Sequence, residues 1–346
     1  MVVDSPKQGR KRSPISSPGG DALADMDRLV VAALQVNPRA SWQQIAKVLD
    51  VSESTVSRRA KRLLDSGSVH IAAVPDPLRC RLGFPVLMQV ECAMGAAESV
   101  ARTLSLRPDV RFVALLTGTY DLVLEIVVPS RNHLGEVVFR EFNLIPGIRR
   151  TTTETVIRNF KMTYDWSRSL LGANADKLES RPKVDTPMAR IGGVDTVDLH
   201  LIQLLASNGR LSASELAQQS EASESSVRRR LDALESSGAI RFATLVDPTL
   251  MGFESPVFLW LEVDLAAIEG VAASLSSLPE VRYLSATAGY SDLVAEAILP
   301  DLDHLYLFMT EVLGTLPGIR RSEVSLEINT IKRGYLTEDT STGQSH

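Results

Sequence analysis

The sequence predicts an α+β protein in which a three-helix domain and a βαββαβ domain occur together, and in which this pair is repeated. Three observations support this fold class. Asp27 aligns with Asp198, and the same shift of 171 residues superimposes the two halves with almost no gap. The spacing of apolar residues changes within each half from a period of 3.6 to a period of 2. The apolar fraction of 44% is typical of a globular chain.

The repeat covers nearly the whole chain, so each half is expected to be a complete module. Matching positions occur in the helical part, in the connector and in the sheet part of each half. They include Asn37 and Asn208, Arg39 and Arg210, Arg58 and Arg229, Asp76-Pro77 and Asp247-Pro248, Gly118 and Gly289, Asp121 and Asp292, and Pro146 to Arg150 with Pro317 to Arg321.

The helical domain of the first half is predicted over residues 23–75, and that of the second over residues 194–246. In the first, helices are expected over Asp25 to Gln35, Ser41 to Leu49 and Ser52 to Gly67. Serines are good N-caps and glycine favours the left-handed conformation that ends a helix. Three short helices with a tight turn between the last two predict a helix-turn-helix.

The third helix has two different faces. At 100° per residue, Val56, Ala60, Leu63 and Leu64 fall on one side. The opposite side carries Ser54, Arg58, Lys61 and Arg62. A basic helix is most often simply a solvated one. Its place as the last helix of a helix-turn-helix favours instead a helix that contacts the phosphates and bases of DNA.

The sheet domains are predicted over residues 84–164 and 255–336 with the ferredoxin-like order βαββαβ. In the first, the expected elements are strands over 68–74, 84–92, 110–117, 122–128 and 151–157, the first of which leaves the helical domain, and helices over 96–106 and 131–144. A Pro-containing connector separates each helical domain from its sheet domain.

The remaining segments are a basic tail over residues 1–22, expected to be disordered, and a linker over residues 165–193. A short helix near Trp166 is expected to pack on the first sheet domain. The net charge of −5 permits a local basic patch but not indiscriminate coating of nucleic acid. Two cysteines, Cys80 and Cys92, exclude a disulfide framework. No signal peptide or membrane span is recognisable, so a cytoplasmic, nucleoid-associated protein is expected.

Each half resembles a complete member of the Lrp/AsnC family of transcriptional regulators. The residues that carry the resemblance are the acidic start of helix one, the turns VSESTV and ASESSV, the closing Ser-Gly, the Asp-Pro connector, the hairpins TGTYDL and AGYSDL, and the PGIRR segment. The resemblance implies a transcription regulator without enzymatic activity that binds double-stranded DNA. It also implies a small-molecule effector, commonly an amino acid, bound between paired sensor domains, no metal or cofactor, and assembly into homo-oligomers.

The candidate site residues follow from this resemblance and from the helix faces. The candidates for DNA binding are Ser54, Thr55, Ser57, Arg58, Arg59, Lys61, Arg62, Ser225, Ser226, Arg228, Arg229 and Arg230. The candidates for effector binding are Thr117, Gly118, Tyr120, Asp121, Gly289, Tyr290 and Asp292. For the glycines and aspartates of these loops, ordinary turn chemistry is the alternative reading.

The two halves are not equivalent at these positions. Lys61 and Arg62 become Asp232 and Ala233 in the second half, and Ser57 becomes Arg228. Fewer exposed cations predict weaker, less salt-sensitive DNA binding by the second helix. The second effector loop also differs, since Ala288 and Ser291 replace Thr117 and Tyr120.

Two other functions were weighed. Proteins built from paired Lrp/AsnC-type modules also include sirohaem decarboxylases, which hold a tetrapyrrole on histidine-bearing strands. Here the corresponding strands read VRFVALLTG and VRYLSATAG and contain no histidine. A sensor or scaffold that has lost DNA binding is plausible for the second half alone. His133 and His304 coincide under the shift, but neither has a second metal ligand at suitable spacing.

Overall fold

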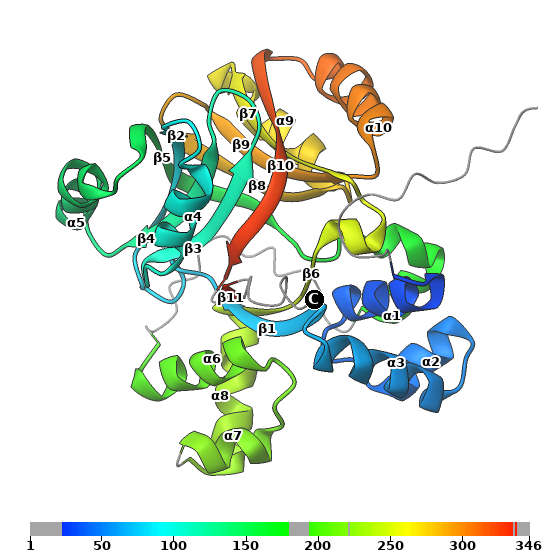
Figure 1. Cartoon of the computed structure of the whole chain (residues 1–346). Helices are drawn as coiled ribbons and strands as arrows, with labels where there is room; N and C mark the ends of the chain where they lie inside the picture. Colours follow the sequence, from blue (N-terminus) through cyan, green and yellow to red (C-terminus); the bar gives the residue numbers. More distant parts are fainter. Residues whose placement is uncertain (1–22, 180–193, 221, 335, 338–346) are drawn as a thin grey trace, which may run out of the picture.

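The computed structural model describes residues 23–179, 194–220, 222–334 and 336–337 (Figure 1). The predicted tail and residues 180–193 of the predicted linker lie outside this range. Each half begins with three helices. They are α1 (Asp25–Val36), α2 (Trp42–Leu49) and α3 (Glu53–Asp65) in the first half, and α6 (Thr196–Ser207), α7 (Ala213–Ser220) and α8 (Glu224–Ser236) in the second.

Side-chain caps fix where these helices begin. Ser41 and Gln44 form a capping box at the start of α2, and Asp195 and Asp198 form one at the start of α6. Ser52 accepts a hydrogen bond from the backbone of Thr55 at the start of α3. The recognition helix predicted from the sequence therefore starts where its cap residue indicates.

A βαββαβ unit follows in each half. The first unit consists of β2 (Phe84–Cys92), α4 (Ala97–Ser105), β3 (Val110–Leu116), β4 (Leu122–Val128), α5 (Arg131–Glu136) and β5 (Ile148–Met162). The second consists of β7 (Ser255–Val263), α9 (Ile268–Ser277), β8 (Val281–Ala288), β9 (Leu293–Leu299), α10 (Leu302–Leu307) and β10 (Ile319–Arg333). Helix α5 continues through a π-helical turn and a 3-10 turn to Leu144, as the sequence predicts.

The two units join edge to edge into a closed ring of eight strands among the described residues. Strand β5 of the first unit pairs with β8 of the second, and β10 pairs both with β7 of its own unit and with β3 of the first. Closure gives the inner edge of each sheet a partner. It also explains why β5 and β10 are longer than the predicted strands, because each continues along a strand of the other half. The two sensor units thus pair within one chain.

The ring has an outer core and an inner core. Helices α4 and α5 cover the outside of the first unit, and α9 and α10 cover the second (Figure 1). Aromatic side chains gather inside the ring, where the Phe112 and Phe258 ring centroids lie 5.6 Å apart and Trp260 packs beside Phe258.

Strands β1 (Val69–Pro75) and β6 (Ile240–Val246) leave the two helical domains and pair antiparallel with each other. Ala72 lies opposite Ala243, which is its own counterpart under the 171-residue shift. The pseudo-twofold relation between the halves therefore passes through this strand pair. Each helical domain also packs on the connector of the other half, since Met251 lies in the first helical core and Cys80 in the second.

The first part of the predicted linker is ordered, contrary to expectation. Residues Arg168–Lys177 form a 3-10 segment that packs on α1. Trp166 is buried in the core of the first helical domain and meets the Phe253 ring edge-on at 5.1 Å. The prediction that this segment packs on the first sensor unit is wrong, because the apolar face available to it belongs to α1.

Candidate nucleic-acid interface and effector loops

Helix α3 presents the basic face that the sequence predicts. Val56, Ala60 and Leu63 are buried against the helical core. Ser54, Arg58 and Lys61 are exposed on the outside. Among the described residues no carboxylate pairs with Arg58 or Lys61. Both cations are therefore available to an external anion such as a DNA phosphate.

Two of the predicted DNA-contacting arginines are engaged within the protein. Arg59 Nη1 lies 2.8 Å from Asp27 Oδ1, and Arg62 also pairs with Asp27. Asp27 is only 2% exposed, so this carboxylate needs cationic partners to be stable. The arrangement ties α3 to α1 and reduces the number of free cations on the outer face.

The second half repeats this tie. Arg230 Nη1 lies 2.8 Å from Asp198 and 2.7 Å from Asp195. Arg230 and Asp198 are the counterparts of Arg59 and Asp27 under the repeat. The shared arginine at this position therefore positions the recognition helix in both halves.

The outer face of α8 is less cationic than that of α3. Arg228 pairs with Glu224 one turn earlier, and Asp232 is exposed on the same helix. Arg229 is exposed and has no ion-pair partner among the described residues. The remaining candidates on both helices are hydroxyl groups that are exposed or half-buried, namely Ser54, Thr55, Ser57, Ser225 and Ser226.

Replacing Asp27 by Ala is expected to lower the free energy of unfolding by about 2 kcal/mol, because two guanidinium groups lose a buried partner. Asp198→Ala is expected to cost less, since Asp198 is more exposed and Asp195 still holds Arg230. Urea unfolding followed by circular dichroism measures both. An equal loss in the two variants would contradict this difference between the halves.

A reciprocal pair of arginines joins the two helical domains. Arg39 donates to the carbonyl of Leu211 at 3.0 Å, and its counterpart Arg210 donates to the carbonyls of Pro38 and Ala40 at 2.7 and 3.0 Å. Arg39 also stacks over the Phe242 ring and Arg210 over the Trp42 ring. Burial lowers the pKa of both groups, and for Arg210 the nearby Arg39 adds to the effect. With the β1–β6 pair, this contact fixes how the two recognition helices are placed.

The predicted effector loops lie where the two sensor units meet. In the first loop, Asp121 accepts a hydrogen bond from the backbone of Cys92 at 2.6 Å. In the second, Asp292 accepts one from the backbone of Val263 at 2.7 Å. Each aspartate thus fastens its own hairpin to the neighbouring strand. This geometry favours a role in shaping the loop over direct contact with a ligand.

The other loop residues face the junction between the units. Thr117 exchanges hydrogen bonds with Leu326 of the other half, and the Tyr120 hydroxyl lies 3.1 Å from that of Thr152. In the second loop, the Tyr290 hydroxyl accepts from Arg321. Gly118 and Gly289 are exposed beside them.

Sequence reasoning missed Glu154, which lies directly under the second loop. This side chain is 0% exposed, and its carboxylate accepts a hydrogen bond from the Ser291 backbone at 3.2 Å. A side chain at position 289 would lie 2.8 Å from the Glu154 carboxylate carbon, which explains the glycine there. The counterpart of Glu154 under the first loop is Ser325, and this difference could have been read from the repeat.

Burial raises the pKa of Glu154, although hydrogen bonds from Ser291 and Tyr290 oppose the shift. A carboxyl group with a raised pKa in the folded state destabilises the fold once the pH exceeds the ordinary carboxyl range. Glu154→Gln is therefore expected to leave stability unchanged at low pH and to raise the melting temperature at neutral pH. Thermal unfolding of both proteins between pH 4 and pH 8 tests this. A difference that is constant over this range would contradict it.

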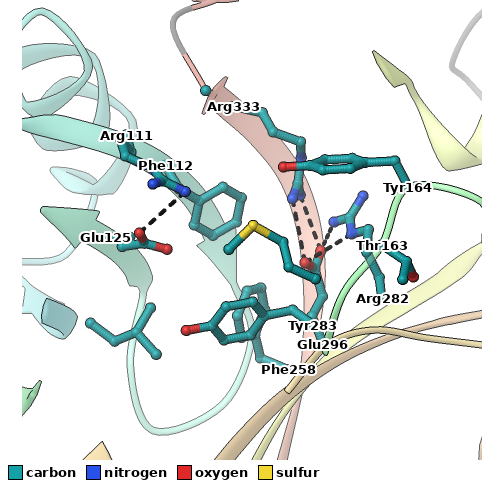
Figure 2. A pocket seen from close by; sticks show the side chains of 13 residues that line it. Arg111, Phe112, Glu125, Thr163, Tyr164, Phe258, Arg282, Tyr283, Glu296 and Arg333 are labelled. Carbon is teal, nitrogen blue, oxygen red and sulfur yellow. Dashed lines mark hydrogen bonds and ion pairs between the residues drawn. The ribbon is translucent and has the colours of Figure 1, made fainter. Parts of the chain in front are cut away.

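The ring encloses a cavity of about 50 Å³. Figure 2 shows Arg111 and Glu125 on one side of it, and Arg282 and Arg333 around Glu296 on the other. The Arg282 Nε atom lies 2.9 Å from Glu296, and Arg333 lies 3.0 Å from the same carboxylate. A water molecule needs roughly 10–15 Å³ of such space, so the cavity holds a few waters or a small group.

The cysteines and the paired histidines show no sign of chemistry. Burial raises the pKa of both Cys80 and Cys92 to about 11, which keeps them as neutral thiols. His133 and His304 lie near helix starts beside Glu136 and Asp301. No group of potential metal ligands occurs among the described residues. No helix in the described part of the chain is long and apolar enough to cross a membrane.

Comparison with known proteins identifies the domains. The Lrp/AsnC ligand-binding domain matches residues 86–166 and again 256–337. An AsnC-type helix-turn-helix domain matches residues 23–64, and a winged helix-turn-helix DNA-binding domain matches residues 194–241. The repeat deduced from the sequence thus corresponds to two sets of the same pair of domains.

Relatives match about one half of the chain. An uncharacterised HTH-type transcriptional regulator of Pyrococcus horikoshii is 31% identical over 153 residues, which are 44% of this chain and 97% of the relative. The HTH-type transcriptional regulator Ptr1 of Methanocaldococcus jannaschii is 32% identical over 142 residues, 41% of this chain and 96% of Ptr1. The protein therefore belongs to the Lrp/AsnC family of HTH-type transcriptional regulators. It carries two modules of that family in one chain.

One solved structure is similar over nearly the whole length. The siroheme decarboxylase NirDL aligns with 92% of this chain and 95% of its own at a TM-score of 0.57 and 15% identity. At this identity the similarity concerns the fold alone. It shows that the arrangement of two modules in a ring also occurs in another protein.

Proposed function

We propose that this protein is a sequence-specific DNA-binding regulator whose single chain contains both DNA-reading helices of a dimer. The supporting observation is that α3 and α8 lie on opposite halves of one pseudo-twofold unit joined by the β1–β6 pair. Arg58 and Arg229 are exposed on those helices. An arginine fork can bind the O6 and N7 acceptors of guanine in the major groove. Lys61 adds a phosphate contact on α3, where the chromosome is the partner.

We further propose a small-molecule effector, an amino acid or related metabolite, bound at the loop of residues 117–121. This loop is exposed and lies at the junction of the two sensor units. A ligand that bridges the junction would change how the units fit together, and the units in turn carry the DNA-binding domains. No catalytic step is needed for this role.

The test is genome-wide mapping of bound DNA with and without each candidate amino acid, followed by titration of the recovered sites with purified protein. We expect a small set of promoters whose occupancy changes with one amino acid. Uniform occupancy across the genome would contradict sequence-specific regulation.

The decarboxylase-like function remains the alternative because of the shared fold with NirDL. The cavity inside the ring opposes it, since the lining arginines are held by glutamates and the space suits a few waters rather than a macrocycle. The described lining residues include no histidine. Titration with an iron porphyrin, followed by absorbance, separates the two functions. Tight stoichiometric binding without DNA affinity would favour the enzyme.

We also propose that chains assemble through the outer helices. Large apolar side chains are exposed there on both halves, including Phe139 and Leu144 beyond α5, and Leu302 and Tyr306 on α10. Exposed apolar patches are typical of protein interfaces. Light scattering of the wild type and of Phe139→Glu tests this, and an unchanged mass in the variant would argue against this surface.

A further inference from the structure

The two effector loops are related by the repeat, but they face different partners. The loop at Gly118 lies on Ser325 of β10, and the loop at Gly289 lies on Glu154 of β5. Ser325 and Glu154 are counterparts under the 171-residue shift. The two junctions between the sensor units therefore have the same backbone design and differ in one buried side chain.

At the second junction the glutamate fills the space under the loop. Glu154 is 0% exposed and accepts hydrogen bonds from the Ser291 backbone at 3.2 and 3.4 Å to its two oxygens. Ser291 itself is 3% exposed. Successive backbone N–H groups in a turn form a concave site for anions. The carboxylate of Glu154 thus occupies an anion site made by the Gly289 loop.

At the first junction this position lacks a carboxylate. Ser325 is 1% exposed, and its hydroxyl has no hydrogen-bond partner among the described residues. The backbone N–H of Tyr120, the counterpart of Ser291, also has no partner among them. A Cβ built at Gly118 would meet only Ser325 within 4 Å, with the hydroxyl at 3.1 Å. A buried, unpaired hydroxyl beside an unpaired N–H is a costly arrangement unless a ligand completes it.

We propose that the Gly118 loop binds the carboxylate of a small-molecule effector in the place that the Glu154 carboxylate fills at the other junction. The ligand would accept hydrogen bonds from the loop backbone and from Ser325. Glu154 then acts as a permanent internal occupant of the second junction, so the chain takes up one carboxylate ligand rather than two. This inference rests on the proposed effector function and specifies its chemistry and stoichiometry.

The experiment uses the full chain and four exchanges at the two counterpart positions. The variants are Ser325→Glu, Glu154→Ser, the double exchange Glu154→Ser/Ser325→Glu, and Glu154→Gln as the matched control that keeps the second junction filled. Each protein is titrated calorimetrically with the individual proteinogenic L-amino acids and with sodium acetate as a minimal carboxylate. The amide of each binding amino acid shows whether the carboxylate is required. Operator binding and melting temperature are measured in parallel.

The expected stoichiometry is one ligand per chain for the wild type and for Glu154→Gln, none for Ser325→Glu, two for Glu154→Ser, and one for the double exchange. The amides are expected to bind at least tenfold more weakly, because they lack the carboxylate charge. Should Glu154→Ser unfold, the loss of binding in Ser325→Glu still decides the first junction.

Two failures are distinguishable. If the wild type binds an amino acid but Ser325→Glu binds it equally, the inference is overturned and the effector function stands. If no carboxylate binds any of these proteins, the inference and the effector function both fail. The operator titration then shows whether DNA binding survives without them.

Discussion

Arg58→Ala is expected to weaken operator binding roughly tenfold or more, and Arg229→Ala to weaken it clearly less. A guanidinium fork on guanine contributes about 1–3 kcal/mol of discrimination, and a factor of ten corresponds to about 1.4 kcal/mol. Arg58 acts beside Lys61 on a face without an exposed anion opposite it. Arg229 shares its helix with Asp232 and with an arginine already paired to Glu224. Fluorescence anisotropy with a recovered operator measures both affinities.

The matched control is Arg102→Ala, which removes an exposed arginine from α4 on the outside of the ring. Its affinity should equal that of the wild type. The salt dependence gives a second readout, since Lys61→Ala should lower the slope of log affinity against log salt by about one. Equal losses in Arg58→Ala and Arg229→Ala would show that the two recognition helices contribute alike, contrary to the asymmetry of their charges.

The module architecture could be predicted because each element depends on local sequence. Serine caps and apolar periodicity determine where α2 and α3 begin and which face is buried. Strands β2 and β4 have the predicted bounds because both lie inside one unit. The ends of β5 and β10 could not be predicted, since they pair with strands more than a hundred residues away.

The candidate DNA-binding surface was predicted too broadly for a related reason. A helical wheel places Arg62 with Arg58 and Lys61, but it contains no information about Asp27 on another helix. The repeat held a usable signal, because Asp27 and Arg59 recur together as Asp198 and Arg230. Residues shared by both halves include such structural ties, whereas the differences between the halves, as at Glu154 and Ser325, mark where their functions can diverge.

The double variant Arg39→Ala/Arg210→Ala is expected to lose affinity for a complete operator by roughly tenfold, while its affinity for an isolated half-site stays near that of the wild type. The two arginines bind backbone carbonyls and aromatic rings of the opposite domain. Their loss leaves the β1–β6 pair as the main link between the helical domains. The second recognition helix is then held less firmly, and its effective concentration at the second half-site falls. Anisotropy titrations with both DNAs measure this difference.

Spacing between the half-sites gives the decisive control. A rigid pair of recognition helices should prefer one spacing, near one helical turn of about 34–36 Å or a multiple of it. The double variant should bind operators of altered spacing almost as well as the natural one, because looser domains tolerate different separations. If affinity for the isolated half-site falls by the same factor as for the complete operator, Arg39 and Arg210 contact DNA themselves. In that case the placement of the two helices depends on the β1–β6 ladder, whose register is centred on Ala72 and Ala243.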